Sequence, residues 1–134
     1  MNDLTRPMQS TALAPAIDAA TLEPLLDMGG PDLRVALCAQ LTADFQRLNA
    51  AIGDPDGAQV ARAAHELKGL ASTVGAGRLA SMARSFETAL QGLGTEARAV
   101  LALPPQREIA RVLDTLADAA KCAAPDSETD TTKA

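Results

Sequence analysis

The sequence predicts an all-α protein, an antiparallel four-helix bundle with a short additional helix at its N-terminal end. Alanine and leucine supply most of the apolar residues, whereas aromatic residues make up 1% of the 134-residue chain. This composition favours helices, because sheets draw on β-branched and aromatic residues. Apolar residues also recur every three or four positions in segments separated by glycine and proline, and no segment alternates as a half-buried strand does.

The N-terminal part of the pattern predicts a short helix and one long helix. The short helix has one apolar face and ends at Gly29 and Gly30; the face consists of Ile17, Leu22, Leu25 and Leu26. The long helix begins at Pro31, a residue suited to a first helical turn, and a Gly-Asp-Pro-Asp-Gly run at 53–57 ends it. Its apolar stripe consists of Leu33, Leu37, Leu41, Phe45, Leu48 and Ile52.

Three further helices are predicted, with a weaker segment before the last of them. Residues 58–74 form a helix that ends at Gly75 and Gly77, and residues 79–93 form the next. Residues 95–103 are interpreted as a weaker helical turn or loop before Pro104 and Pro105, and a last helix follows. Its apolar face consists of Ile109, Val112, Leu113, Leu116 and Ala120. The ends have no apolar period, so residues 1–15 and 125–134 are predicted to be disordered tails around a domain at 16–124.

Charge and cysteine content narrow the function classes. A formal net charge of −5 argues against a protein that binds the nucleic-acid backbone, and the lack of aromatics argues against base stacking. Two cysteines, Cys38 and Cys122, and one histidine are too few for a usual zinc site, so no metal is expected. Two cysteines are enough for one disulfide, although two free thiols are the simpler interpretation. No signal peptide or membrane-spanning run is visible, which predicts a soluble, cytoplasmic protein.

The only histidine lies on the outer face of the helix at 58–74. Each residue advances about 100° around a helix axis, so the apolar residues fall on one side and His65 on the other. The predicted core stripe is Val60, Ala63, Ala64, Leu67, Leu70, Ala71 and Val74. The residues within about 60° of His65 are Ala58, Ala61, Arg62, Lys68, Gly69 and Ser72. The imidazole is therefore predicted to point outward from a surface of small and basic residues.

The residues around His65 favour phosphoryl transfer over acid–base catalysis. Glycine inside a helix costs about 1 kcal/mol relative to alanine, and Gly69, one turn beyond His65, removes a side chain that would crowd a group on the ring. Lys68 and Arg62 can offset phosphate charge while a ring nitrogen attacks phosphorus. A histidine that acts as a base is normally oriented by a carboxylate. The neighbouring turns of the same helix supply none, and Glu66 is turned about 100° away.

The run His65-Glu66-Leu67-Lys68-Gly69, continued by Gly75-Ala76 and Leu79, resembles the histidine-containing phosphotransfer (HPt) domain of bacterial multistep phosphorelays, which carries an H-x-L-K-G motif. The resemblance implies a helical bundle over residues 16–124, with His65 as phosphoacceptor and Lys68 as the partner of the phosphate. It implies that Gly69 leaves room for an incoming receiver domain. Phe86-Glu87 stands where the family has a Leu-Glu-like pair.

Some members of that family place a glutamine beside the histidine. Here Glu87 occupies the corresponding region and Gln91 lies one turn further. Glu87 would accept a hydrogen bond from the ring and fix its tautomer, but it would repel a phosphate, so its role stays open. Candidate docking residues are Ala61, Arg62, Ser72 and Glu87. Arg78 and Arg84 are interpreted as solvated residues, with a docking rim as the alternative.

The leading hypothesis is a phosphocarrier, not an enzyme, that relays a phosphoryl group between receiver domains of response regulators or hybrid histidine kinases. Mg²⁺ is expected on the receiver partner and no cofactor on this chain, which is predicted to be a monomer without nucleic-acid or membrane partners. No glycine-rich phosphate loop indicates a kinase. Two alternatives remain: a helical interaction module that binds through the His65 face without chemistry, and a small hydrolase, disfavoured because no carboxylate partner for His65 is apparent.

Overall fold

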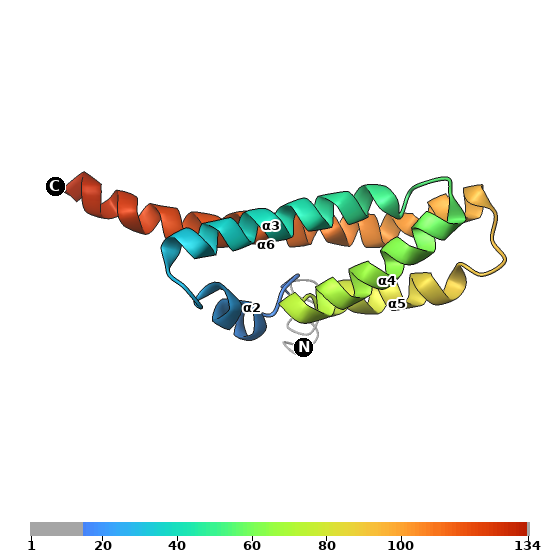
Figure 1. Ribbon diagram of the computed structural model, residues 1–134, viewed down its shortest axis with the longest axis horizontal. Coiled ribbons are helices and arrows are strands. Elements are labelled where there is room, and N and C mark those ends of the chain that lie inside the picture. Colours follow the sequence, from blue (N-terminus) through green and yellow to red (C-terminus); the bar gives the residue numbers. More distant parts are fainter. Residues whose placement is uncertain (1–14, 134) are drawn as a thin grey trace, which may run out of the picture.

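The computed structural model describes residues 15–133, with side chains up to residue 121, and within this part the chain forms five helices and no strand. The helices are α2 (Ala19–Leu26), α3 (Pro31–Ala51), α4 (Gly57–Val74), α5 (Gly77–Ala89) and α6 (Thr95–Lys133). α3 lies along α6, and α4 lies along α5 (Figure 1). The described chain is therefore all-α, as predicted, and α2 is the short additional helix near the N-terminal end.

The ends of α4 show how local sequence sets its limits. At its start, the Asp56 side chain accepts a hydrogen bond of 3.0 Å from the backbone N–H of Ala58, as an N-cap does. At its end, Gly75 has a φ of +87°, in the left-handed region that glycine adopts without steric cost. A Cβ atom at Gly75 would lie 2.7 Å from the Cβ of Thr21. Glycine at this position therefore allows the chain to turn into α5 after two residues.

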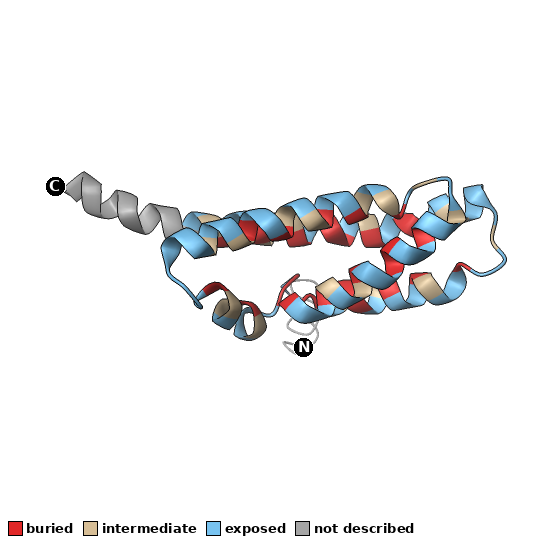
Figure 2. Cartoon of the chain, viewed as in Figure 1, coloured by how far each residue is buried: buried red, intermediate tan, exposed pale blue. Residues whose placement is uncertain are grey.

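The core lies between the helices, where their buried faces meet (Figure 2). Phe45 and Leu48 of α3, and Ile52 at its C-terminal cap, have no exposed surface. The core stripe predicted for α4 is confirmed, with Leu70 partly buried and the other six residues buried. Leu33 was predicted to face the core but is 46% exposed. It lies in the first turn of α3, which extends beyond the end of α4 and α5 (Figure 1).

The prediction of a break before the last helix is wrong. α6 is one helix from Thr95, and Pro104 and Pro105 lie within it. Each proline removes a backbone N–H from the helical hydrogen-bond series, which is why the local sequence suggested an interruption. Two tertiary features favour the continuous helix: Pro105 is buried, and Arg98 donates hydrogen bonds of 2.8 Å to the carbonyl oxygens of Leu93 and Pro55.

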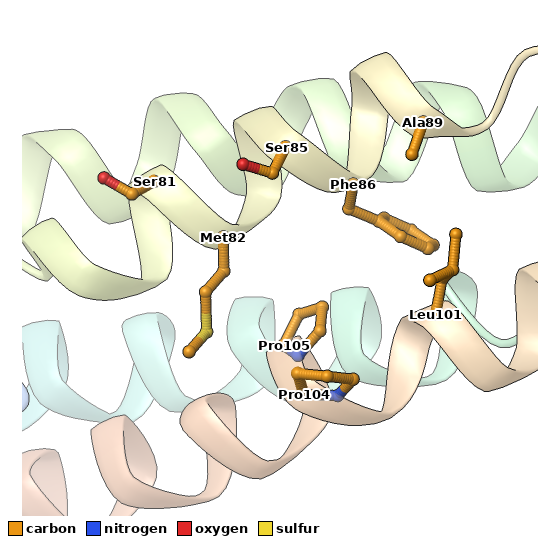
Figure 3. Close-up of a pocket in the computed structure, with 8 residues that line it drawn as sticks. All are labelled: Ser81, Met82, Ser85, Phe86, Ala89, Leu101, Pro104 and Pro105. Atoms are coloured by element: carbon orange, nitrogen blue, oxygen red, sulfur yellow. The ribbon is translucent and has the colours of Figure 1, made fainter.

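A shallow apolar groove of about 350 Å³ lies between α5 and α6. Met82 and Phe86 of α5 point across it toward Leu101 and Pro105 of α6 (Figure 3). The groove is on the α6 side of α5, so it does not include the α4 surface that carries His65.

The predicted domain limits and disordered tails stay predictions. Residues 1–14 and 134 lie outside the described part of the chain, as do the side chains of 122–133, including Cys122. The helical backbone of α6 does continue through 125–133, the segment assigned to the C-terminal tail. Cys38 is a free, buried cysteine, and burial raises the pKa of its thiol. Within residues 15–133, no helix combines the length and apolar character needed to cross a lipid bilayer.

Candidate functional site

His65 lies on the outer face of α4, with 71% of its side chain exposed. The residues predicted around it share this face: Ala58, Ala61, Arg62, Gly69 and Ser72 are exposed, and Lys68 is half-buried. A Cβ atom built at Gly69 would meet no other atom within 4 Å. The space above Gly69 is therefore open to a partner, and the glycine is not required by packing inside this chain.

Glu87 of α5 lies directly beside the histidine. Its Oε2 is 3.1 Å from Nδ1 of His65, and its Oε1 is 3.3 Å from Nζ of Lys68. The sequence left open whether Glu87 or Gln91 lies beside His65, and the structure places Glu87 there. His65 therefore does have a carboxylate partner, and the argument against a hydrolase that rested on its absence is wrong. Glu87 comes from the neighbouring helix α5, and it is the residue that the sequence pattern offered as an acceptor of the ring N–H.

A signal for this contact was present in the sequence. A turn of two residues joins α4 to α5, and two helices connected in this way pack side by side. Residues at similar distances from the turn then face each other. His65 precedes the turn by ten residues and Glu87 follows it by eleven.

The charge state of Glu87 determines which ring nitrogen carries the proton. Partial burial would raise the pKa of its carboxyl, but hydrogen bonds and positive charge from Lys68 and His65 outweigh burial and hold this pKa below its usual range. Glu87 is therefore a carboxylate at neutral pH. An ionised carboxylate only accepts hydrogen bonds, so Nδ1–H of His65 is the donor. This tautomer leaves the lone pair of Nε2 free.

A second ion pair borders the site on the α3 side. Nη2 of Arg47 lies 2.6 Å from Oε2 of Glu66, and this hydrogen bond is the main reason that the pKa of Glu66 lies below its usual value. Glu66 is thus turned away from the imidazole, as its angular position predicts. In the described part of the chain, no cluster of three or more His, Cys, Asp or Glu side chains is suited to hold a metal ion.

The arrangement has three chemical properties. One imidazole nitrogen is nucleophilic and exposed, the other is fixed by a carboxylate, and an ammonium group lies on the far side of that carboxylate. A neutral histidine in this tautomer can attack an electrophilic phosphorus. The flat, open surface around it suits approach by another macromolecule.

Comparison with known proteins gives one match. No curated protein and no solved structure is significantly similar to this chain. The family model for the Hpt domain matches residues 32–123, which span α3 to α5 and most of α6. This range is more than half of the chain and contains His65, Lys68, Gly69 and Glu87. The chain therefore belongs to the Hpt domain family, whose members take part in histidine phosphotransfer in phosphorelays.

Proposed function

We propose that His65 accepts a phosphoryl group on Nε2 from the aspartyl phosphate of one receiver domain and passes it to the aspartate of another. The observation that carries this proposal is the exposed imidazole whose Nδ1–H is held by the Glu87 carboxylate at 3.1 Å. Because Nδ1 is occupied, the reactive lone pair is on Nε2 of this largely exposed side chain.

The transfer balances in charge and protons without a base on this chain. The Nε2 lone pair forms the N–P bond while the P–O bond of the acyl phosphate breaks, and the receiver recovers its carboxylate. The ring then carries a positive charge, because Nδ1 keeps its proton. The Glu87 carboxylate offsets that charge. In the reverse direction the ring leaves as neutral imidazole, a better leaving group than its anion.

Lys68 and Gly69 have supporting roles in this proposal. Lys68 turns from Glu87 toward the phosphoryl oxygens, a short movement for a flexible side chain that is 31% exposed. Gly69 leaves room for the receiver surface. Mg²⁺ and most groups that stabilise the transition state belong to the receiver, so this chain is a phosphocarrier and not an enzyme. We also infer that α3 to α6 form an antiparallel four-helix bundle, since α3 packs along α6 and α4 along α5.

A transfer assay tests the proposal. Purified chain is incubated with phosphorylated receiver domains, and the adduct is tested for the acid lability and base stability of phosphohistidine. The control is His65→Gln, which keeps its helical circular dichroism because the side chain is exposed. We expect label on the wild-type chain only, and phosphorus–nitrogen coupling in NMR that assigns it to Nε2. Label on His65→Gln would exclude the assignment.

The alternative, an interaction module without chemistry, predicts a different result. Such a module binds receiver domains equally well with glutamine at position 65 and never acquires label. The hydrolase alternative predicts that phosphate is released with no lasting adduct.

A further inference from the structure

Two arginines beside the site differ from the other basic residues around it. Lys68 and Arg47 each form an ion pair with a carboxylate of this chain, Glu87 and Glu66 respectively. Arg62 of α4 and Arg84 of α5 are exposed, and their guanidinium groups form no ion pair or hydrogen bond with any other described residue. Their guanidinium groups are therefore available to groups outside this chain.

The two arginines lie on opposite sides of the reactive histidine. Arg62 precedes His65 by three residues on α4, and Arg84 precedes Glu87 by three residues on α5. Each is thus about 4.5 Å along its helix axis from the contact between His65 and Glu87. The two-residue turn makes α5 run opposite to α4, so these steps go in opposite directions along the molecule (Figure 1).

The α4 surface around His65 carries small side chains. Ala61, Gly69 and Ser72 are exposed on it, and a Cβ atom at Gly69 would meet no other atom within 4 Å. A flat partner surface can therefore reach His65 while both guanidinium groups contact it. Arg78, the other arginine of α5, pairs instead with Glu108 of α6 at 3.0 Å and faces away from this surface.

The charge of this region is opposite to that of the whole chain. Three basic residues and one acidic residue of α4 and α5 lie around His65, a formal charge of +2, whereas the chain carries −5; they are Arg62, Lys68, Arg84 and Glu87. A chain with net negative charge repels an acidic partner in most orientations. A local positive surface favours the one orientation in which His65 faces that partner, and it raises the rate of productive encounter.

We propose that Arg62 and Arg84 are docking residues that bind carboxylates on both sides of the phosphorylated aspartate of a receiver domain. The proposal rests on the proposed function and names the charge of the partner surface. Guanidinium groups suit this role because they bind carboxylates through two parallel hydrogen bonds and stay charged at every physiological pH. The partner class is therefore a receiver domain whose surface around the aspartate is acidic on two sides.

The test separates docking from chemistry by using two phosphoryl donors. One is the phosphorylated receiver domain that transfers fastest to the wild-type chain within a panel. The other is phosphoramidate, a small donor that needs no docking surface. The variant is Arg62→Glu with Arg84→Glu. The matched control is Arg107→Glu with Lys121→Glu. It reverses two exposed basic residues on α6 and therefore changes the net charge by the same amount.

With the receiver as donor, we expect the double variant to lose on the order of tenfold or more in kcat/KM at low ionic strength, and to show a weaker dependence on salt than wild type. With phosphoramidate, the loss is several-fold smaller than with the receiver, because an effect of Arg62 on phosphate charge acts on both donors, whereas docking acts on the receiver alone. The Arg107→Glu, Lys121→Glu control transfers from both donors at the wild-type rate.

Three outcomes would overturn the proposal. Equal receiver kinetics for the double variant and wild type would show that the arginines do not dock the partner. An equal loss with both donors would show that they act on the histidine chemistry. Failure of wild type to take label from either donor would overturn the proposed function, which the other two results leave standing.

Discussion

Enlarging Gly69 is expected to change stability and transfer in opposite directions. Gly69 is an exposed position inside α4, and a Cβ atom there meets no atom within 4 Å. Gly69→Ala therefore gains helix propensity without strain, which raises the free energy of unfolding by about 1 kcal/mol. For a domain of this size that gain corresponds to an increase in Tm of about 4 °C.

The transfer reaction is expected to respond to the size of the new side chain. Gly69→Gln projects a long side chain into the space above the helix next to His65, where the receiver surface approaches. A displacement of about 1 Å in the reacting groups costs on the order of 100-fold in rate, so kcat/KM for transfer from a phosphorylated receiver falls by about 10- to 100-fold. Labelling by phosphoramidate stays close to the wild-type rate, because that donor is small.

Urea unfolding followed by circular dichroism measures the first effect, and rapid-quench phosphotransfer measures the second. The matched control is Ala110→Gln, which adds the same side chain to an exposed position on α6. Unchanged kcat/KM for Gly69→Gln would refute the role of the glycine in access to His65. A loss of stability in Gly69→Ala would show that a Cβ atom at position 69 does meet other atoms of the chain.

Three other predictions concern charge, turn and core. Protonation of Glu87 removes the negative charge beside the imidazole N–H, and because the pKa of this carboxyl lies below its usual range, the charge is lost only at correspondingly low pH; a pH–rate profile of Glu87→Gln lacks this contribution. Gly75→Ala has to adopt a φ of +87° and meets Thr21, so it destabilises by about 1–3 kcal/mol in urea, whereas Gly77→Ala, with no atom within 4 Å, does not; equal stabilities would contradict the strain. Phe45→Ala empties a fully buried position and costs about 3–5 kcal/mol in the same assay; a cost below 1 kcal/mol would place that ring outside the core.

Much of the site could be predicted because its first features lie within one helix. The spacing of apolar residues in α4 determines which face is buried, and helical geometry then places His65, Lys68 and Gly69 relative to that face. The exposure of the histidine follows from that arithmetic alone. The roles assigned to these three residues stay predictions until transfer is measured.

The contact of His65 with Glu87 required the tertiary structure. The two residues are 22 positions apart on different helices, and their 3.1 Å separation depends on the angle and register at which α4 and α5 pack. The same packing pairs Lys68 with Glu87, while the guanidinium groups of Arg62 and Arg84 have no ion-pair or hydrogen-bond partner among the described residues. Local periodicity carries no information on register between helices, so these charges could not be assigned from it.

The sequence by itself determined the helical class, the buried face of each helix and the outward direction of the only histidine, because these depend on residue type and on the period of 3.6. Only the tertiary structure decided that α6 continues through Pro104 and Pro105, and that Leu33 lies outside the core. For α6 the hydrogen bond from Arg98 to Pro55 comes from a segment distant in the chain, whereas Leu33 is exposed because its turn of α3 extends beyond α4 and α5. Both outcomes depend on how the helices pack, which the local pattern of apolar residues does not determine.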